Sequence, residues 1–277
     1  MKRYIFITLL LFPLSIFAQQ MNIISYNIRY ATENDRFNNW PERVDMVNGL
    51  FKFHDPDIFG LQEALYKKIK DIENELPEFE WIGVGRDDGE KEGEFSPIFY
   101  NKNEFILIKN GHFWLSENCD EPGLGWDAAC NRIVTWGKFQ SKVTGKRFFV
   151  FNTHFDHRGV EARKNSANLI RDKVKELIGE SNLPVILTGD FNLTPEQEPI
   201  RMLKKHFKDS RDITEEPPYG PVGTFSGFKV TADLDRRIDY VFVQGEIKVI
   251  EYAVLTDNKD KRTPSDHLPV FVRVQLN

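Results

Sequence analysis

The sequence predicts an α/β protein in which two mixed β-sheets pack face to face with helices on the outside. The chain opens in a β-α-β-α order, because the β-rich run 21–28 and the buried run 57–62 are each followed by an amphipathic segment. The pattern then recurs, since the long amphipathic segment 160–178 precedes a second buried strand at 185–189. Each half adds short strands that pair antiparallel, so two mixed sheets are expected.

The composition is that of an ordinary globular protein. The chain has 277 residues, of which 40% are hydrophobic and 29% charged, and this excludes disordered, collagen-like and coiled-coil proteins. A formal net charge of -5 gives no general affinity for polyanions, so any bound phosphate must be met locally. The Pro- and Gly-rich loop 216–227 is flanked by strand signals and is too short for a boundary, so residues 19–277 are expected to form one domain.

Residues 1–18 have the features of a secretory signal peptide. Lys2 and Arg3 precede a largely apolar run, 5–17, and the small residue Ala18 follows it. The run is too short for an ordinary membrane span. We therefore expect export to the periplasm or the extracellular space, with the loss of two positive charges on cleavage.

The first half of the exported chain is expected to alternate helices and strands. In the helix 40–53, Val47, Leu50 and Phe51 share one face, and Pro41 occupies a first-turn position that tolerates proline. A second helix, 65–76, has Ile69 and Ile72 facing inward. The strands expected here are 21–28, 57–62, 81–85, 97–100, 105–108, 133–139 and 148–152.

The second half contains the longest expected helix, 160–178, with Ala167, Ile170 and Val174 on one stripe. Pro184 then introduces the buried strand 185–189. The remaining expected elements are a short helix at 196–206 and strands at 238–243, 249–255 and 270–274.

Export also affects the two cysteines, Cys119 and Cys130. They bracket a loop that contains Pro122, Gly123 and Gly125, and an oxidising compartment allows them to pair. A bridge that closes so short a loop would stabilise the fold by about 2–3 kcal/mol. We predict this disulfide, with two separate reduced thiols as the alternative.

Polar side chains gather at the ends of the expected strands. Loops at strand ends are where α/β proteins build their sites, so we expect these side chains to converge on one edge. Each residue alone is an ordinary turn or cap residue, but carboxylate, amide and imidazole groups together indicate a site. The residues are Asn27, Glu63, His154, Asp190, Asn192, Asp239, Asp266 and His267.

This set suits the hydrolysis of a phosphate ester, which builds negative charge and needs a hard cation, hydrogen-bond donors and a base. Glu63 suits the cation, because Mg²⁺ takes one or two protein carboxylates and keeps several waters. Asp190 is left as the base or the group that orients water. The side chains able to donate to phosphoryl oxygen are Asn27, Asn192, His154 and His267, and the two amides can instead help to hold the metal shell.

The motifs SYNIR, LQE, NTHFDHR, TGDFN, RRIDYVF and PSDHLPV, in that order, resemble those of the endonuclease/exonuclease/phosphatase superfamily. The resemblance covers nearly all of the exported chain and implies a four-layered, deoxyribonuclease I-like α/β sandwich. It also implies Mg²⁺-dependent phosphoester hydrolysis, with Mn²⁺ as a substitute. By this resemblance Glu63 is the main metal ligand with Asn27 and Asp266 near it, His154 and Asn192 contact the scissile phosphate, Asp190 acts on the water or the leaving group, and Asp239 orients His267.

The chain departs from some relatives at two positions. Arg29 stands where some carry a second acid, so one early metal carboxylate is missing. His154 is similar to the histidine of the deoxyribonuclease I, sphingomyelinase and deadenylase branches and not to the tyrosine of the exonuclease III branch. Abasic-site repair is therefore disfavoured.

The substrate stays open at this point. Arg132 and Arg158 are candidates to bind substrate, and Trp40 and Trp126 are candidates to stack on a base, a sugar or a lipid. A phosphodiesterase or nuclease is the first interpretation, and a phosphatase or sphingomyelinase-like phospholipase is the second, so the substrate is a nucleic acid, nucleotide, phospholipid or sugar phosphate. A catalytically inactive binding module is the remaining alternative. No stable protein partner is implied, and a monomer is expected.

Overall fold

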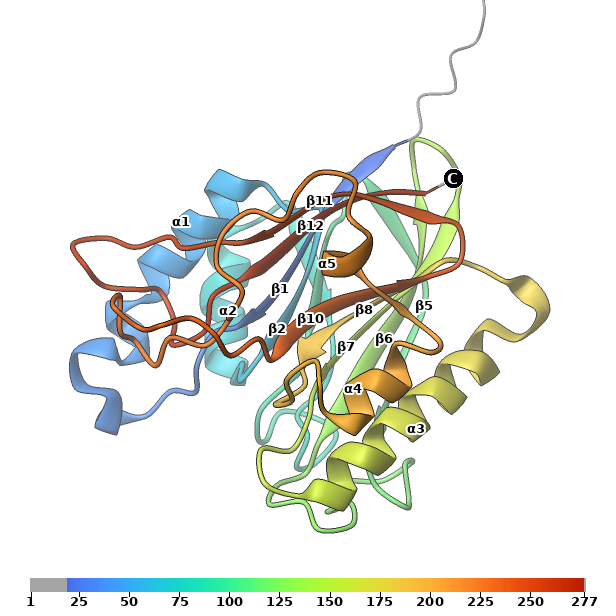
Figure 1. Ribbon diagram of the computed structural model, residues 1–277, viewed down its shortest axis with the longest axis horizontal. Helices are drawn as coiled ribbons and strands as arrows, with labels where there is room; N and C mark the ends of the chain where they lie inside the picture. Colours follow the sequence, from blue (N-terminus) through green and yellow to red (C-terminus); the bar gives the residue numbers. More distant parts are fainter. Residues whose placement is uncertain (1–18, 277) are drawn as a thin grey trace, which may run out of the picture.

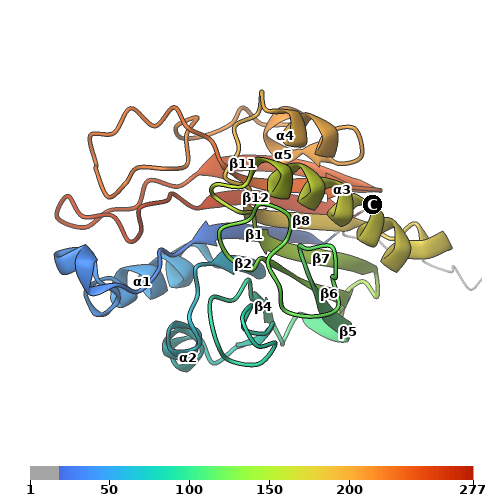
Figure 2. The same ribbon diagram turned by 90° about the horizontal axis from the view of Figure 1, so that it is seen from below.

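A computed structural model describes residues 19–276, and the expected signal peptide, residues 1–18, lies outside this range. The described chain forms two six-stranded mixed sheets with helices on their outer sides (Figure 1). Figure 2 shows α3 (Val160–Ile178) and α4 (Glu198–Leu203) on the opposite side of the sheets from α2 (Tyr66–Glu75). The fold class predicted from the sequence is therefore confirmed.

The first sheet has the strand order β11-β12-β1-β2-β4-β3. β1 runs parallel to β2 and antiparallel to β12. The helices α1 (Val44–His54) and α2 (Tyr66–Glu75) pack on its outer face through residues such as Leu50 and Ile69. Its strands are β1 (Gln20–Asn27), β2 (Ile58–Gln62), β3 (Phe79–Ile82), β4 (Ile98–Asn101), β11 (Ile247–Val254) and β12 (Val270–Leu276).

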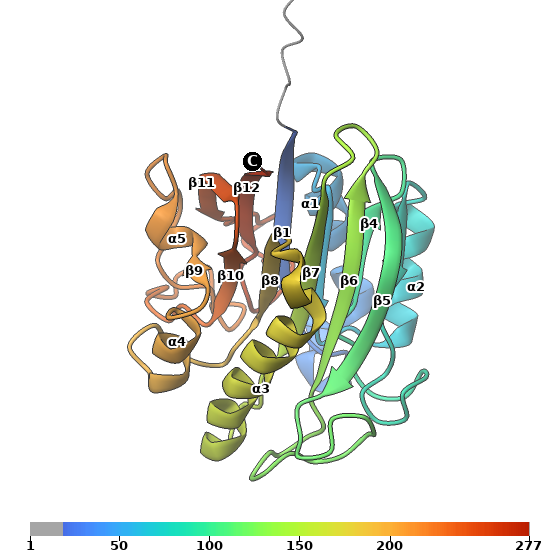
Figure 3. The ribbon, with the colours of Figure 1, turned by 90° about the vertical axis from the view of Figure 1, so that its right-hand side faces the viewer.

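The second sheet has the order β5-β6-β7-β8-β10-β9, with β7 and β8 parallel. The helices α3 (Val160–Ile178) and α4 (Glu198–Leu203) cover its outer face, as Figure 3 shows for the long α3. Its strands are β5 (Phe105–Trp114), β6 (Ile133–Ser141), β7 (Arg147–His154), β8 (Val185–Asp190), β9 (Lys208–Asp209) and β10 (Asp239–Gln244). The short elements are η1 (Glu33–Asn38), η2 (Trp40–Glu42), η3 (Gly179–Ser181) and α5 (Ser210–Ile213).

The facing surfaces of the two sheets are mostly apolar and contain a buried polar network around Asn152. Asn152 on β7 accepts a hydrogen bond from Gln62 Nε2 on β2 at 2.7 Å and one from Thr188 Oγ1 on β8 at 3.0 Å. Its own amide group donates to the carbonyl of Leu61 at 2.7 Å. The network needs a glycine opposite it, because a Cβ at Gly60 would lie 2.4 Å from Thr188 Oγ1. These bonds lock the two sheets together beside the strand ends that carry the site.

The structure differs from the sequence prediction mainly in element lengths. β5 continues past Ile108 to Trp114 through a bulge between Leu107 and Lys109, which shifts the alternation that marks a strand. The helix expected to begin at Trp40 starts instead as a separate 3₁₀ turn, and the α-helix begins at Val44. The short β9 and α5 were not predicted.

The antiparallel pairing of β1 with β12 brings both ends of the described chain together. Gln20 lies opposite Gln275, at the end of the sheet remote from Asn27. Lys146, in the hairpin between β6 and β7, donates to the carbonyl of Leu276 at 2.8 Å at this same end. Within residues 19–276, no helix combines the length and apolarity needed to cross a membrane.

Candidate active site

The register of the parallel strands brings the polar strand ends to one edge. Asn27 lies beside Gln62, one residue before Glu63, because β1 and β2 are parallel. His154 lies beside Asp190 for the same reason, and Asp239 at the start of β10 lies on the other side of Asp190. Both sheets thus contribute to a single cluster.

Three strand-end residues adopt the left-handed backbone conformation. Arg29, Glu63 and Asn192 have φ of 58°, 57° and 51°, although none is a glycine. Such conformations are uncommon and cost about 1–2 kcal/mol each, and they concentrate at functional sites. At Glu63 the turn points the carboxylate back over the sheet edge, where it accepts hydrogen bonds from Tyr30 N–H and Asn27 Nδ2.

A cavity of about 390 Å³ opens at this edge. Six of the eight strand-end residues singled out in the sequence line it, whereas Asn27 and Asp239 do not line it and bond to residues that do. The strand-end residues in its wall are Glu63, His154, Asp190, Asn192, Asp266 and His267, the predicted substrate residue Arg132 also lines it, and the others are Arg29, Tyr30, Glu94, Cys130, His157, Phe225, Arg236 and Ile238.

Asn27 bridges two carboxylates. Its Nδ2 donates to Glu63 Oε1 and to Asp190 Oδ2, both at 2.9 Å, while its Oδ1 accepts from Arg29 N–H at 2.9 Å. Burial raises the pKa of Asp190, but the neighbouring histidines and the bonds from Asn27 and the Asn192 backbone outweigh this effect and lower it below its usual range. Asp190 is therefore ionised throughout the neutral range.

His154 lies between two acids. Its Nε2 is 3.5 Å from Asp190 Oδ2 and its Nδ1 is 3.7 Å from Glu94 Oε2. Asn192 Nδ2 lies 3.1 Å from the same Nε2. Burial raises the pKa of Glu94, but His154 and Arg86 have the larger, opposite effect, so the pKa of Glu94 falls to about 2. Sequence reasoning missed Glu94, which precedes Phe95 and lies outside any strand end.

His267 and Asp239 form a buried pair. His267 Nδ1 lies 2.8 Å from Asp239 Oδ2, which also accepts from Thr224 Oγ1 at 2.6 Å. Burial lowers the pKa of His267, yet the charges of Asp239 and Asp190 raise it well above its usual value. Burial raises the pKa of Asp239 to about 6 against the opposing effect of His267. The imidazole is thus held in its charged form, with Nε2 3.7 Å from Asp190 Oδ2.

Glu63 and Asp266 are suited by chemistry to a hard divalent cation. Both carboxylates line the cavity. Burial raises the pKa of Asp266, His267 opposes the rise, and the charge of Glu63 adds to it. A cation would relieve this repulsion, and two carboxylates match the number that Mg²⁺ takes. Asp190, Asp239 and His267 form a second group with ligand atoms within 4.8 Å of one another, but there Asp239 already engages His267 Nδ1.

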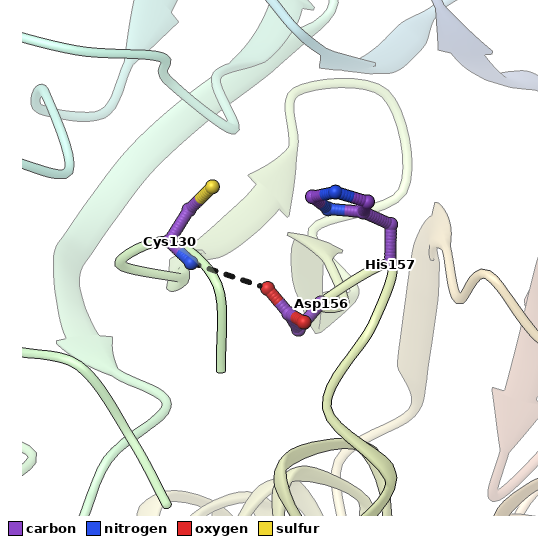
Figure 4. A group of neighbouring side chains, drawn as sticks. All are labelled: Cys130, Asp156 and His157. Carbon is purple, nitrogen blue, oxygen red and sulfur yellow. Dashed lines mark hydrogen bonds between the residues drawn. The ribbon is translucent and has the colours of Figure 1, made fainter. Parts of the chain in front are cut away.

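Cys130 and His157 line the cavity, and the buried Asp156 lies beside them, with ligand atoms of the three residues within 4.8 Å of one another (Figure 4). Asp156 Oδ2 accepts from the backbone N–H groups of Ala129 and Cys130, and Arg132 Nε lies 3.6 Å from it. Arg132 Nη2 is 3.2 Å from His157 Nδ1. With Asp156 satisfied and a guanidinium beside it, this cluster positions Arg132 and does not favour a metal.

The predicted disulfide between Cys119 and Cys130 is not present, and both cysteines are free thiols. Cys119 packs against the apolar core between the second sheet and its outer helices, whereas Cys130 lines the cavity. The backbone N–H of Cys130 donates to Asp156 at 3.3 Å, and the carbonyl of Cys119 accepts from Trp114 N–H at 2.9 Å. The two side chains therefore have different surroundings, which the short sequence separation did not reveal.

The other substrate candidates divide between the cavity and elsewhere. Arg132 is buried in the cavity wall, with Nη1 lacking a hydrogen-bond partner, whereas Arg158 is exposed and does not line the cavity. Trp40 is a buried core residue, and Trp126 is half-buried outside the cavity. Arg236, which sequence reasoning missed, lines the cavity beside the Phe225 ring.

Comparison with known proteins places these features in context. The profile of the Endonuclease/Exonuclease/phosphatase family matches residues 24–267. A crystal structure of a protein of that family from Bacteroides thetaiotaomicron is 40% identical, with a TM-score of 0.89 over 94% of this chain and 96% of that one. A mannosyl-6-phosphatase from the same organism is 41% identical, with a TM-score of 0.88 over 92% and 99%. An uncharacterised protein of Acanthamoeba polyphaga mimivirus is 28% identical over 91% of this chain and 99% of its own length.

Proposed function

The chain belongs to the endonuclease/exonuclease/phosphatase family and is a phosphoric ester hydrolase, and we propose that its substrate is a sugar phosphate monoester, hydrolysed with Mg²⁺ outside the cytoplasm. Sequence reasoning placed a phosphodiesterase or nuclease first and a phosphatase second. We place the phosphatase first, and the side chains that line the cavity support this choice.

The main observation is a set of cationic side chains that line a small cavity together with the carboxylates described above. Arg29, Arg132 and Arg236 line it together with the charged His267. A terminal phosphate carries close to two negative charges, against one for a diester, so it gains more from several cations at short range. The protein as a whole is acidic, so a phosphate must be bound by local cations of this kind.

Two aromatic rings support the sugar assignment. Tyr30 and Phe225 line the cavity, and Phe225 packs edge-on to His267 with ring centroids 5.1 Å apart. An aromatic face is a suitable platform for the apolar face of a sugar ring. The resemblance to the mannosyl-6-phosphatase, at 41% identity over nearly the whole chain, supports the same class.

The proposed roles follow from the contacts. Glu63 and Asp266 would hold the cation, which supplies charge stabilisation to the phosphoryl oxygens. Asp190, ionised and 3.5 Å from His154, would orient the attacking water and accept its proton. His267, His154 and Asn192 would donate to the phosphoryl oxygens as their charge grows.

Export is proposed from the sequence of residues 1–18 alone. It is tested by sequencing the N-terminus of the protein recovered from a periplasmic or culture fraction. A mature protein that begins near residue 19 is expected, and recovery only of uncleaved cytoplasmic protein would reject export.

The substrate class is tested by incubating purified residues 19–277 with Mg²⁺ and measuring kcat/KM on mannose 6-phosphate, glucose 6-phosphate, bis-p-nitrophenyl phosphate, DNA and RNA. We expect phosphate release from the hexose phosphates to be at least tenfold more efficient than diester cleavage, and EDTA to abolish both. Preferential cleavage of DNA or RNA would restore the nuclease interpretation.

A further inference from the structure

Two buried cations lie behind the proposed metal site, outside the cavity. We infer that Lys68 and Arg43 are positioning residues that hold the three segments bearing Asn27, Glu63 and Asp266 in the arrangement a divalent cation requires. The inference rests on the proposed metal role of these segments.

Lys68 joins the turns that follow β1 and β2. It lies on α2 and is only 1% exposed. Its Nζ donates to the carbonyls of Ile28 at 3.2 Å, Glu63 at 3.1 Å and Arg29. Arg29 and Glu63 are two of the left-handed residues, and the three donors of one ammonium match these three carbonyls.

Arg43 joins the first of these turns to the segment before β12. It is fully buried, and its Nη1 donates to the carbonyls of Ile28 at 3.0 Å and Pro264 at 2.7 Å. Pro264 lies two residues before Asp266. The carbonyl of Ile28 accepts from both Lys68 and Arg43, so the two cations link all three segments.

Trp40 supports both cations from behind. Lys68 Nζ lies 4.6 Å and Arg43 Cζ 5.6 Å from its ring centroid, within the range of cation–π attraction. The indole Nε1 donates to Asp71 on α2 at 2.8 Å, which fixes the ring. Trp40 therefore affects the site by holding Lys68 and Arg43 in place.

A buried ammonium is expensive unless its donors are satisfied, and an apolar residue would pack more cheaply at this position of α2. Only a side chain with several hydrogen-bond donors can pair with the backbone carbonyls that the left-handed turns direct away from the strands. Without it the carbonyls of Arg29 and Glu63 would be buried without partners, and the turns would relax. The Glu63 carboxylate would then lose its position relative to Asp266.

The test is Mn²⁺ binding by purified protein without substrate, followed as the loss of the free Mn²⁺ electron paramagnetic resonance signal. Lys68→Met removes the donors and keeps much of the length, Lys68→Gln keeps two donors, and Lys67→Met is the matched control at an exposed neighbour on the same helix. We expect Kd for Mn²⁺ to rise about tenfold or more in Lys68→Met, by less in Lys68→Gln, and to stay unchanged in Lys67→Met. Turnover at saturating metal should recover most of its wild-type value.

A purely structural role predicts a different result. Lys68→Met would then have a lower melting temperature and wild-type Mn²⁺ affinity in its folded fraction, which would overturn the inference. If Lys68→Met does not fold, Lys68→Gln and Arg43→Lys carry the same comparison. Wild-type protein that binds no Mn²⁺ would reject the metal assignment together with the inference, whereas wild-type binding that Glu63→Gln abolishes and Lys68→Met leaves intact would reject the inference alone.

Discussion

Replacing Asp239 by Asn tests whether the charged state of His267 matters for turnover. The two groups are buried, 0% and 5% exposed, and 2.8 Å apart, and Asn keeps the shape of Asp while removing its charge. Thr224 Oγ1, which donates to the same carboxylate oxygen, can still donate to the Asn carbonyl. The substitution is therefore aimed at the charge.

The magnitude follows from the burial of the pair. Breaking a buried ion pair by removing one partner costs about 3–5 kcal/mol, because the remaining charge is left uncompensated. His267 avoids this cost by losing its proton and becoming neutral. Loss of a charged donor to the phosphoryl oxygen lowers turnover by roughly 10² to 10⁴. We expect Asp239→Asn and His267→Ala each to fall in this range.

The pH dependence has a definite sign. The pKa of His267 lies well above 6.5 in the folded protein, so the stability that comes from its protonation is present below about pH 6.5 and is lost as pH rises through the folded value. The carboxyl of Asp239, whose pKa is raised to about 6, is ionised only above about that pH, so the ion pair is complete between these two limits. In Asp239→Asn the pKa of His267 falls. The alkaline limb of the kcat profile should therefore move toward neutral pH.

The assay is kcat against pH for wild type, both single variants and the double variant. If the residues act as one unit, the double variant should be hardly worse than the poorer single variant. Losses that multiply fully, or an alkaline limb that does not move in Asp239→Asn, would refute the coupling.

Four further predictions concern the metal, the packing, a buried acid and the thiols. Glu63→Gln should lower activity about 10²-fold or more at limiting Mg²⁺ with an unchanged circular dichroism spectrum, and near wild-type turnover would reject the metal assignment. Gly60→Ala should destabilise by about 3 kcal/mol in urea titration because its Cβ meets Thr188 Oγ1 at 2.4 Å, whereas Gly49→Ala, in a helix with nothing within 4 Å, should stabilise by about 0.5–1 kcal/mol. Burial raises the pKa of Asp57 to about 6, so its ionisation reduces stability as pH rises from about 4 to 6, and Asp57→Asn should stabilise by about 1–2 kcal/mol at pH 7 and not at pH 4. Thiol labelling of denatured, non-reduced protein should modify both cysteines, and a single bridged species would contradict the structure.

The sequence predicted the sheets and helices well because their signals are local. Apolar periodicity defines α3 at both of its observed ends, and buried runs locate β2 and β8. The polar residues after those strands converge because parallel strands end at a common edge. A sequence pattern that predicts parallel strands therefore also predicts that their ends lie at one edge.

The rest of the site depends on side-chain direction and loop conformation, which leave no periodic pattern in the sequence. Arg132 and Arg158 look equivalent in sequence, but only Arg132 is turned inward, by Asp156 and His157. Glu94 and Arg236 come from segments outside the predicted strand ends. Lys68 did leave a signal, since it precedes Ile69 on the inward face of α2, but a lysine there is normally assigned to solvent.

The pairing of β1 with β12 has a practical consequence for how the enzyme can be handled. Gln20 and Gln275 are neighbours at the end of the sheet remote from the cavity. A tag, a resin or a fused partner attached at either end of the described chain would sit behind the catalytic edge and leave its mouth facing the solution. A short linker between these two ends, with a new opening in the exposed turn near Gly145, is accordingly a reasonable design for a circularly permuted enzyme.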